Sequence, residues 1–134
     1  EPVMKAISFN VKSIRTRLHQ LEAVIEKHHP DFIGLQETKV NDPDFPVDTI
    51  QALGYNVEYF GQKTHYGVAI LSKHPFKKVI KGFSGDDELA QRRFIGGVFD
   101  TPGGDVNKFP NKYFAKAQFS LFIQYLTVGG VIVP

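Results

Sequence analysis

Hydrophobic residues near the start of the chain recur first with a period of two and then with a helical period. Residues 5–10 alternate and end at Asn10, a residue type disfavoured inside strands, so they predict a short strand. Ser13 is expected to cap a helix that closes at residues 28–30. The apolar positions of this helix lie at i, i+4, i+7 and i+11: Ile14, Leu18, Leu21 and Ile25. A strand followed by an amphipathic helix is therefore predicted.

A nearly continuous apolar run follows at residues 32–37 and ends in polar residues. Such a run is typical of a buried parallel strand. With the strand and helix before it, the run predicts a βαβ unit, whose crossover is nearly always right-handed. Asn10 and Glu37 should then emerge at the same carboxyl edge of the sheet.

A second helix and a hairpin are predicted in the middle of the chain. Pro46 at a first helical position and Gly54 as a stop mark a short helix. Alternation over residues 55–59 and 66–72 predicts two antiparallel strands joined by a turn.

The last third of the chain predicts strands at residues 79–83, 93–99 and 131–133. A returning strand should follow the turn after residue 99, but residues 106–107 are too few to pair along the strand before them. Residues 115–126 are instead predicted to form a helix. Its apolar positions lie at i, i+3, i+4 and i+7: Phe119, Phe122, Ile123 and Leu126.

Composition excludes several classes of function. A chain of 134 residues, 42% hydrophobic, suits one packed domain, so a single domain is expected over residues 1–134, with residues 1–3 unassigned. The absence of cysteine excludes disulfides, cysteine-based zinc sites and a thiol nucleophile, and it agrees with a cytoplasmic location. The net charge of +2 names no partner. No apolar run approaches the about 20 residues that span a bilayer, so no membrane partner is expected.

The two polar residues that end the predicted parallel strands are candidates for a metal site. If the strands are neighbours, their backbones lie about 4.8 Å apart, so Asn10 and Glu37 could reach one ion. Mg²⁺ binds oxygen ligands, keeps several waters and needs only one or two protein carboxylates. Glu37 would be the ligand, and Asn10 would orient it or a bound water. The alternative stays open that Asn10 only ends a strand and Glu37 lies in a solvated loop.

Several uninterrupted motifs resemble the exonuclease III family, the bacterial abasic-site endonucleases and exonucleases of the endonuclease/exonuclease/phosphatase superfamily. The likeness is dense from Met4 to about Phe99 and resumes at residues 114–119. The segments that carry it are Met-Lys-Ala-Ile-Ser-Phe-Asn (4–10), Leu-Gln-Glu-Thr-Lys (35–39), Gly-Gln-Lys-Thr-His-Tyr-Gly-Val-Ala-Ile (61–70), Gly-Asp-Asp-Glu (85–88), Ala-Gln-Arg-Arg (90–93) and Phe-Ala-Lys-Ala-Gln-Phe (114–119).

The resemblance implies an α/β fold in which two β-sheets form a sandwich flanked by helices, as in DNase I-like proteins. It implies Mg²⁺-dependent phosphodiester hydrolysis, with Mn²⁺ as an alternative ion, on duplex DNA with abasic sites or 3′ ends during base-excision repair. Glu37 corresponds to the metal-ligating glutamate and Asn10 to the asparagine near it, and both are candidate catalytic and metal residues. The candidate DNA-binding residues are Arg92, Gln62, Lys63, His65 and Tyr66. Arg92 could grip phosphate oxygens bidentately, or it could pair with the acidic residues 86–88.

The sequence also departs from the family pattern. The family's tyrosine in an Asn-Gly-Tyr-Phe-Pro-like segment has no counterpart here, and neither has the Ser-Asp-His motif. The family's Gly-Asp-x-Asn motif should follow residues 131–133, and none follows them in the 134 residues. Weak or absent activity is therefore expected for this chain alone. Most of the second sheet is also expected to be missing. One sheet face would then be uncovered, and a set of side chains would be partly exposed to solvent. That set is Phe83, Phe94, Phe99, Phe119 and Phe122.

Three hypotheses follow from these observations. The first is a DNA repair nuclease of exonuclease III type. The second is a catalytically inactive relative that binds duplex DNA through Arg92 and residues 62–67. The third is a half-domain that associates with a second chain through an uncovered sheet face. A phosphatase for small or lipid phosphates would share the Asn10 and Glu37 sites, but the motifs at 62–67 and 90–93 resemble the DNA repair branch.

Overall fold

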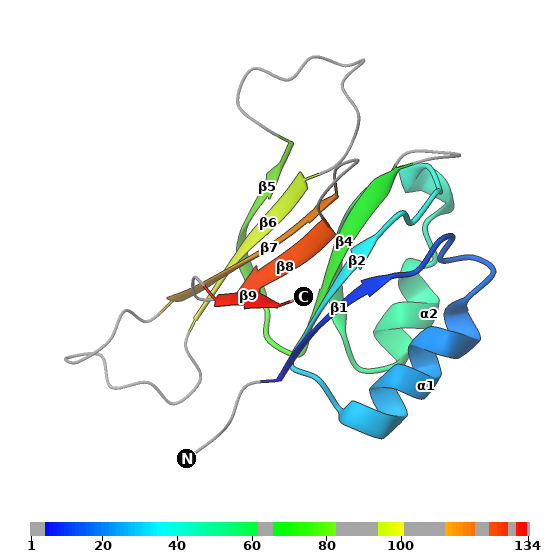
Figure 1. Cartoon of the computed structure of the whole chain (residues 1–134), viewed down its shortest axis with the longest axis horizontal. Coiled ribbons are helices and arrows are strands. Elements are labelled where there is room, and N and C mark those ends of the chain that lie inside the picture. Colours follow the sequence, from blue (N-terminus) through cyan, green and yellow to red (C-terminus); the bar gives the residue numbers. More distant parts are fainter. Residues whose placement is uncertain are drawn as a thin grey trace.

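The computed structural model describes residues 5–61, 66–82, 94–100, 112–119, 124–128 and 131–133, with side chains described up to Phe99. Two β-sheets face each other, and two helices cover the outer face of the first sheet (Figure 1). This two-sheet α/β sandwich is the predicted fold class.

The first sheet has four strands in the order β1-β2-β4-β3. Its strands are β1 (Ala6–Asn10), β2 (Phe32–Gln36), β3 (Asn56–Gly61) and β4 (Gly67–Ser72). Strands β1 and β2 are parallel, and α1 (Leu18–His28) connects them. Strands β3 and β4 form an antiparallel hairpin, and β4 also pairs antiparallel with β2. The predicted βαβ unit and the predicted hairpin are both confirmed.

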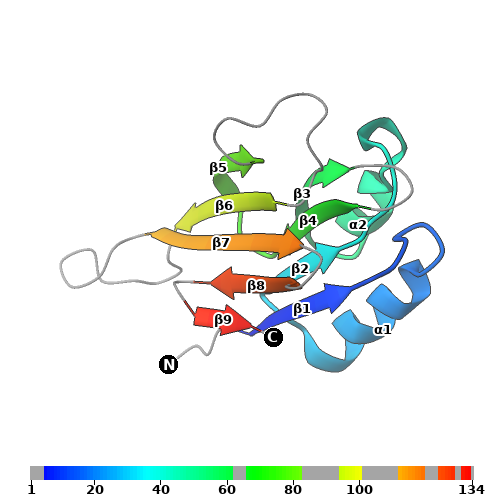
Figure 2. The ribbon, with the colours of Figure 1, turned by 45° about the horizontal axis from the view of Figure 1, so that its top comes forward.

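The second sheet has five antiparallel strands in sequence order (Figure 2). They are β5 (Phe76–Lys81), β6 (Phe94–Asp100), β7 (Lys112–Phe119), β8 (Gln124–Val128) and β9 (Val131–Val133). Strands β6 and β9 match their predicted positions closely, while β5 begins and ends earlier than the predicted strand at 79–83. The sheets touch where β4 contacts β6 and β7 and where β1 contacts β8 and β9.

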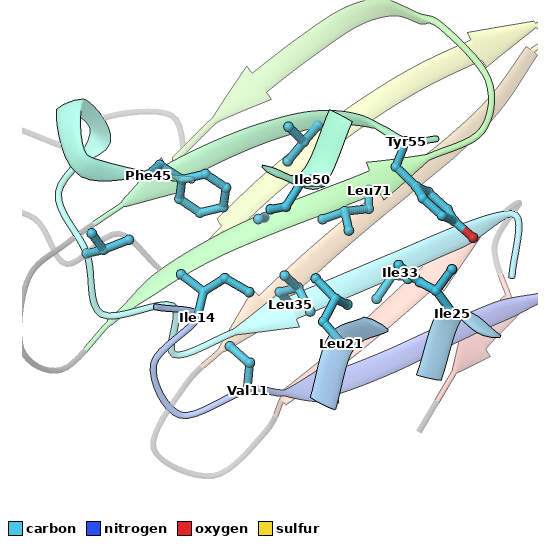
Figure 3. Packing of buried hydrophobic residues seen from close by; sticks show 13 residues of the cluster. Val11, Ile14, Leu21, Ile25, Ile33, Leu35, Phe45, Ile50, Tyr55 and Leu71 are labelled. Atoms are coloured by element: carbon cyan, nitrogen blue, oxygen red, sulfur yellow. The ribbon is translucent and has the colours of Figure 1, made fainter. Parts of the chain in front are cut away.

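The core has two parts, one on each face of the first sheet. Between this sheet and the helices, Leu21 of α1 and Ile50 of α2 (Val47–Ala52) pack with Leu35 of β2 and their neighbours (Figure 3). Between the two sheets, a smaller cluster contains Phe32, Val68, Ile70, Ile95 and Phe99. The first sheet is therefore covered on both faces, which explains why β2 and β4 are buried at every position.

The predicted helix over residues 115–126 is wrong. This stretch contains the end of β7 and the start of β8, which pair with each other from Ala115↔Val128 to Phe119↔Gln124. Ala115, Ala117 and Phe119 alternate with polar residues, which is a strand pattern. Phe119 ends β7 and Leu126 lies in β8, so the apparent helical period joins residues of two different strands. Phe122 and Ile123 lie outside the described residues. The sequence predicted a returning strand after residue 99, but residues 106–107 are too few to form it. Strand β7 is that returning strand, since it pairs with β6 from Phe94↔Gln118 to Asp100↔Lys112.

The expectation of a largely missing second sheet is also wrong. Phe99 is completely buried, and its ring lies 5.0 Å from the Phe32 ring and 4.6 Å from the Phe76 ring. The contact with Phe32 joins the two sheets, so Phe99 on the inner face of β6 is covered. Phe94 is half-buried, and the side chains of Phe83, Phe119 and Phe122 lie outside the described residues.

The first helix begins later than predicted. Residue 13 does not cap it, because α1 starts at Leu18 with Arg17 at the N-cap and without a side-chain capping hydrogen bond. Ser13 instead has a left-handed backbone with φ 96°, and its N–H donates to the Glu37 carbonyl at 2.8 Å. Tertiary contacts with the turn after β2 therefore keep the residues around Ser13 out of the helix. Neither of the two α-helices that the structure describes is long and apolar enough to cross a membrane.

We predict that Phe99→Ala lowers the free energy of unfolding by about 3–5 kcal/mol, because it leaves a cavity between the sheets. The control is Ile80→Ala on the neighbouring strand, where the side chain is 38% exposed and a loss below about 1 kcal/mol is expected. Urea unfolding followed by circular dichroism measures both. Equal losses for the two variants would show that Phe99 does not hold the sheets together.

Tyr55 links α1's end to β3, because its buried hydroxyl donates to the Pro30 carbonyl at 2.5 Å. Burial, and then the negative charge of Asp31, raise the pKa of Tyr55 above its ordinary value. The unfolded chain thus loses this proton at lower pH than the native state does, and stability falls as pH rises above about 10. We predict that Tyr55→Phe costs about 1 kcal/mol at pH 7 and that this difference shrinks above pH 10. Unfolding curves at both pH values test it, and a difference that grows with pH would contradict it.

Candidate active site at the carboxyl ends of β1 and β2

The parallel pairing of β1 with β2 brings Asn10 and Glu37 together. Asn10 lies opposite Gln36 in the register, so Glu37 is the next residue beyond the sheet. The Asn10 side-chain amide donates a hydrogen bond to Glu37 Oε2. The two residues that sequence spacing placed at one sheet edge are therefore in contact, while their catalytic and metal-binding roles remain predictions.

The loop after β1 fixes the orientation of the Asn10 amide. Its Oδ1 accepts a hydrogen bond from the Lys12 backbone N–H at 3.2 Å, so its Nδ2 faces Glu37. The Arg17 guanidinium donates to the carbonyls of Lys12 and Val11, which ties this loop to the start of α1. Asn10 is thus suited to hold the carboxylate in place.

Glu37 and Lys39 both have left-handed backbones, with φ 54° and 57°. For residues with a Cβ this conformation costs about 1–2 kcal/mol each and persists only where the surroundings impose it. Here the surroundings do so through hydrogen bonds: the Thr38 N–H donates to Gly67 O at 3.1 Å, and the Lys39 N–H donates to Tyr66 O at 2.8 Å. The tight turn after β2 is therefore held by the start of β4.

Lys39 is a site residue that the sequence reasoning missed. Its ammonium lies 3.8 Å from Glu37 Oε1, and the two side chains are 31% and 18% exposed. The available signal was its position two residues after the glutamate within the Glu-Thr-Lys motif, which allows both side chains to lie on one side of the chain. The Glu37 carboxylate thus has an amide on one oxygen and a cation near the other.

The donor set of this site fits a divalent ion that retains much of its water. Glu37 offers one partly exposed carboxylate, and Mg²⁺ needs only one or two together with substrate phosphate. Among the described residues, no group of three or more His, Asp or Glu side chains could hold a metal ion. The carboxylate of Glu37 would therefore be the main protein ligand that this part of the chain supplies.

Of the candidate DNA-binding residues, the structure describes only Tyr66. Its carbonyl accepts the Lys39 N–H, which places the end of the predicted 62–67 contact segment beside the Glu37 turn. Gln62, Lys63, His65 and Arg92 lie outside the described residues, as do the acidic residues 86–88 proposed as alternative partners of Arg92.

The fold is a two-sheet α/β sandwich with a glutamate and an asparagine at the carboxyl ends of adjacent parallel strands. Residues 7–129 match the Endonuclease/Exonuclease/phosphatase family, and the chain belongs to this family. The family resemblance stated from the sequence motifs is thereby confirmed.

Comparisons with individual proteins show which members of the family the chain is similar to. The chain is 44% identical to exodeoxyribonuclease III of Haemophilus influenzae over an alignment of 133 positions, which covers 90% of this chain and 50% of that protein. Among solved structures, a 3′ phosphatase from Neisseria bound to a product DNA hairpin is 34% identical with a TM-score of 0.67, covering 74% of this chain and 38% of that one. An AP endonuclease from Archaeoglobus fulgidus is 35% identical with a TM-score of 0.66, covering 71% and 37%. The chain therefore spans about half the length of its bacterial relative.

We predict that the left-handed backbone at Lys39 costs stability that glycine recovers. Lys39→Gly and Lys39→Ala both remove the ammonium beside Glu37, but only glycine adopts φ 57° without strain. Lys39→Gly should be about 1 kcal/mol more stable than Lys39→Ala in urea unfolding. An alanine variant as stable as the glycine variant would show that the turn is not strained.

Proposed function

We propose that this chain carries the N-terminal part of the active site of a DNA repair nuclease of exonuclease III type. The full machinery would hydrolyse the phosphodiester 5′ to an abasic site and remove nucleotides from 3′ ends of duplex DNA. The observation that carries the proposal is the contact between Asn10 and Glu37 at the carboxyl ends of two parallel strands in a chain of this family. A cytoplasmic location, where base-excision repair of bacterial DNA takes place, is part of the proposal.

The residues of the site have complementary roles in this proposal. Glu37 holds Mg²⁺, or Mn²⁺ in its place, and Asn10 orients the carboxylate through its amide. The bound ion would neutralise phosphate charge and lower the pKa of a water molecule. Lys39 lies where its ammonium can leave Glu37 and pair with a phosphate oxygen once a cation occupies the carboxylate. Arg92 would fix the position of the DNA backbone without reading sequence.

The names of the relatives support DNA as the substrate. The Haemophilus protein is an exodeoxyribonuclease, the Archaeoglobus protein is an AP endonuclease, and the Neisseria structure holds a product DNA hairpin. These relatives are about twice as long as this chain or longer, so the whole reaction is proposed only for the complete set of residues that they contain. The family's Ser-Asp-His motif does not occur in the 134 residues, and no Gly-Asp-x-Asn motif follows β9, where the resemblance predicts it.

A second candidate function is duplex binding without hydrolysis. It rests on the turn at Glu37 and on the basic residues Lys39 and Arg92, which could bind phosphate groups without hydrolysing the DNA. Self-association through a sheet face is a third candidate, for which sedimentation showing a well-folded monomer would be decisive against it. It now has less support, because Phe99 on the inner face of β6 is buried within the chain.

We predict weak Mg²⁺-dependent cleavage of an abasic duplex, abolished by EDTA and by Glu37→Gln. The glutamine keeps the shape of the side chain but removes the charge that would hold the ion. Incision is measured on gels with end-labelled DNA, and a full-length relative under the same conditions is the positive control. Glu26→Gln on α1, which removes a charge of the same sign at an exposed position outside the site, controls for general effects of charge.

The binding candidate is separated by fluorescence anisotropy with the same duplex. Binding that weakens steeply with salt, without any cleavage, supports duplex binding alone. Arg92→Ala should then weaken binding about threefold to tenfold and reduce the salt dependence by about one phosphate contact. A chain that neither cleaves nor binds the duplex would overturn both candidates.

A further inference from the structure

The chain that follows Glu37 passes the turn end of the β3–β4 hairpin, where Gly61 and Gly67 pair, and is bonded to both strands. On the β4 side, the N–H groups of Thr38 and Lys39 donate to Gly67 and Tyr66. On the β3 side, the Gly61 N–H donates to Asp42 Oδ1 at 2.6 Å. Gly61 and Gly67 are opposite each other in the register, so these bonds meet at one rung of the hairpin. We call residues 38–42 the crossing segment.

The crossing segment lies directly against the end of β3. A Cβ built on Gly61 would be 2.1 Å from the Val40 carbonyl oxygen and 2.9 Å from Asp42 Oδ1. Real Cβ atoms do not approach other atoms this closely, so any side chain at residue 61 would push the segment away. Just beyond it, the Phe45 ring stacks on Tyr59 of β3, with centroids 4.3 Å apart and planes 2° from parallel. The contact is therefore tight on the β3 side as well as the β4 side.

This arrangement bears on the site because Glu37 and Lys39 need external restraint to remain in the left-handed region. The bonds to Gly67 and Tyr66 hold the first half of the crossing segment, and the Asp42 carboxylate holds the second half. We propose that Asp42 is a positioning residue, which acts on DNA through the Glu37–Lys39 turn and not by contact. The proposal rests on the proposed function, since it assigns Asp42 to the same site.

The sign of the charge makes this proposal testable. Removing a negative charge near a DNA-binding surface should strengthen binding of the polyanion. Loss of the hydrogen bond between Asp42 and Gly61 should instead weaken binding, because Lys39 and the end of the hairpin would no longer be held in place. Asp44 is a matched control: it lies two residues away in η1 (Asp42–Asp44), carries the same charge and is exposed.

The experiment compares Asp42→Ala, Asp42→Asn and Asp44→Ala for binding of an abasic duplex by fluorescence anisotropy at fixed salt. We expect Asp42→Ala to weaken binding about fivefold, the factor that corresponds to one lost hydrogen bond. Asp42→Asn keeps an oxygen that can accept the Gly61 N–H. The dissociation constant of this variant should therefore be equal to or lower than that of the unmodified chain. Asp44→Ala should bind as tightly as the unmodified chain or more tightly.

Hydrogen exchange supplies a second measurement that does not depend on DNA. In Asp42→Ala, and in Gly61→Ala as an independent way to dislodge the segment, the amides of Thr38 and Lys39 should exchange at least severalfold faster. The amides of β2, such as that of Ile33, should keep their rates, because the sheet is intact. This comparison separates a local loss of restraint from a general loss of stability.

The outcomes distinguish the two proposals. If Asp42→Ala binds DNA no more weakly than Asp44→Ala, or if exchange at Thr38 and Lys39 is unchanged, Asp42 is not a positioning residue. If the unmodified chain does not bind the duplex at all, the proposed function fails, and the exchange rates alone then decide whether Asp42 restrains the turn.

Discussion

The hydrogen bond between the Asn10 amide and the Glu37 carboxylate depends on one feature of the backbone, the parallel pairing of β1 and β2. Parallel strands end at the same sheet edge, so two residues 27 positions apart become neighbours. The α1 crossover and the burial of β2 on both faces keep the two strands in register. Every functional role assigned to the site depends on this pairing.

The turn after β2 combines electrostatic and conformational constraints. The carboxylate of Glu37 is placed between an amide donor and the ammonium of Lys39, while its own backbone is left-handed. A cation near a carboxylate competes with a metal ion for the same oxygens, so ion binding and phosphate binding are coupled through Lys39 in the proposed reaction. Neighbouring loops, and not local preference, supply the free energy that keeps this turn in place.

The second sheet gives the first sheet a partner for its other face. Phe32 of β2 and Phe99 of β6 meet edge to face between the sheets, directly behind the strand that leads to Glu37. The chain covers 50% of the Haemophilus protein, and both sheets of the sandwich occur within the part of the chain that the structure describes. Strand β2, which leads to Glu37, is therefore packed against the second sheet within the same chain.

The sequence by itself determined the βαβ unit, the β3–β4 hairpin and the meeting of Asn10 with Glu37, because period and strand direction are local properties with a fixed geometric consequence. Its motifs also identified the family. Tertiary structure decided whether residues 115–126 formed a helix or two strands, since a short apolar pattern fits both periods until β6 offers a pairing edge. It also decided the start of α1, the contact of Lys39 with Glu37 and the bond of Asp42 to Gly61. These contacts join segments whose proximity depends on how the sheet is assembled, which no local pattern of residues encodes.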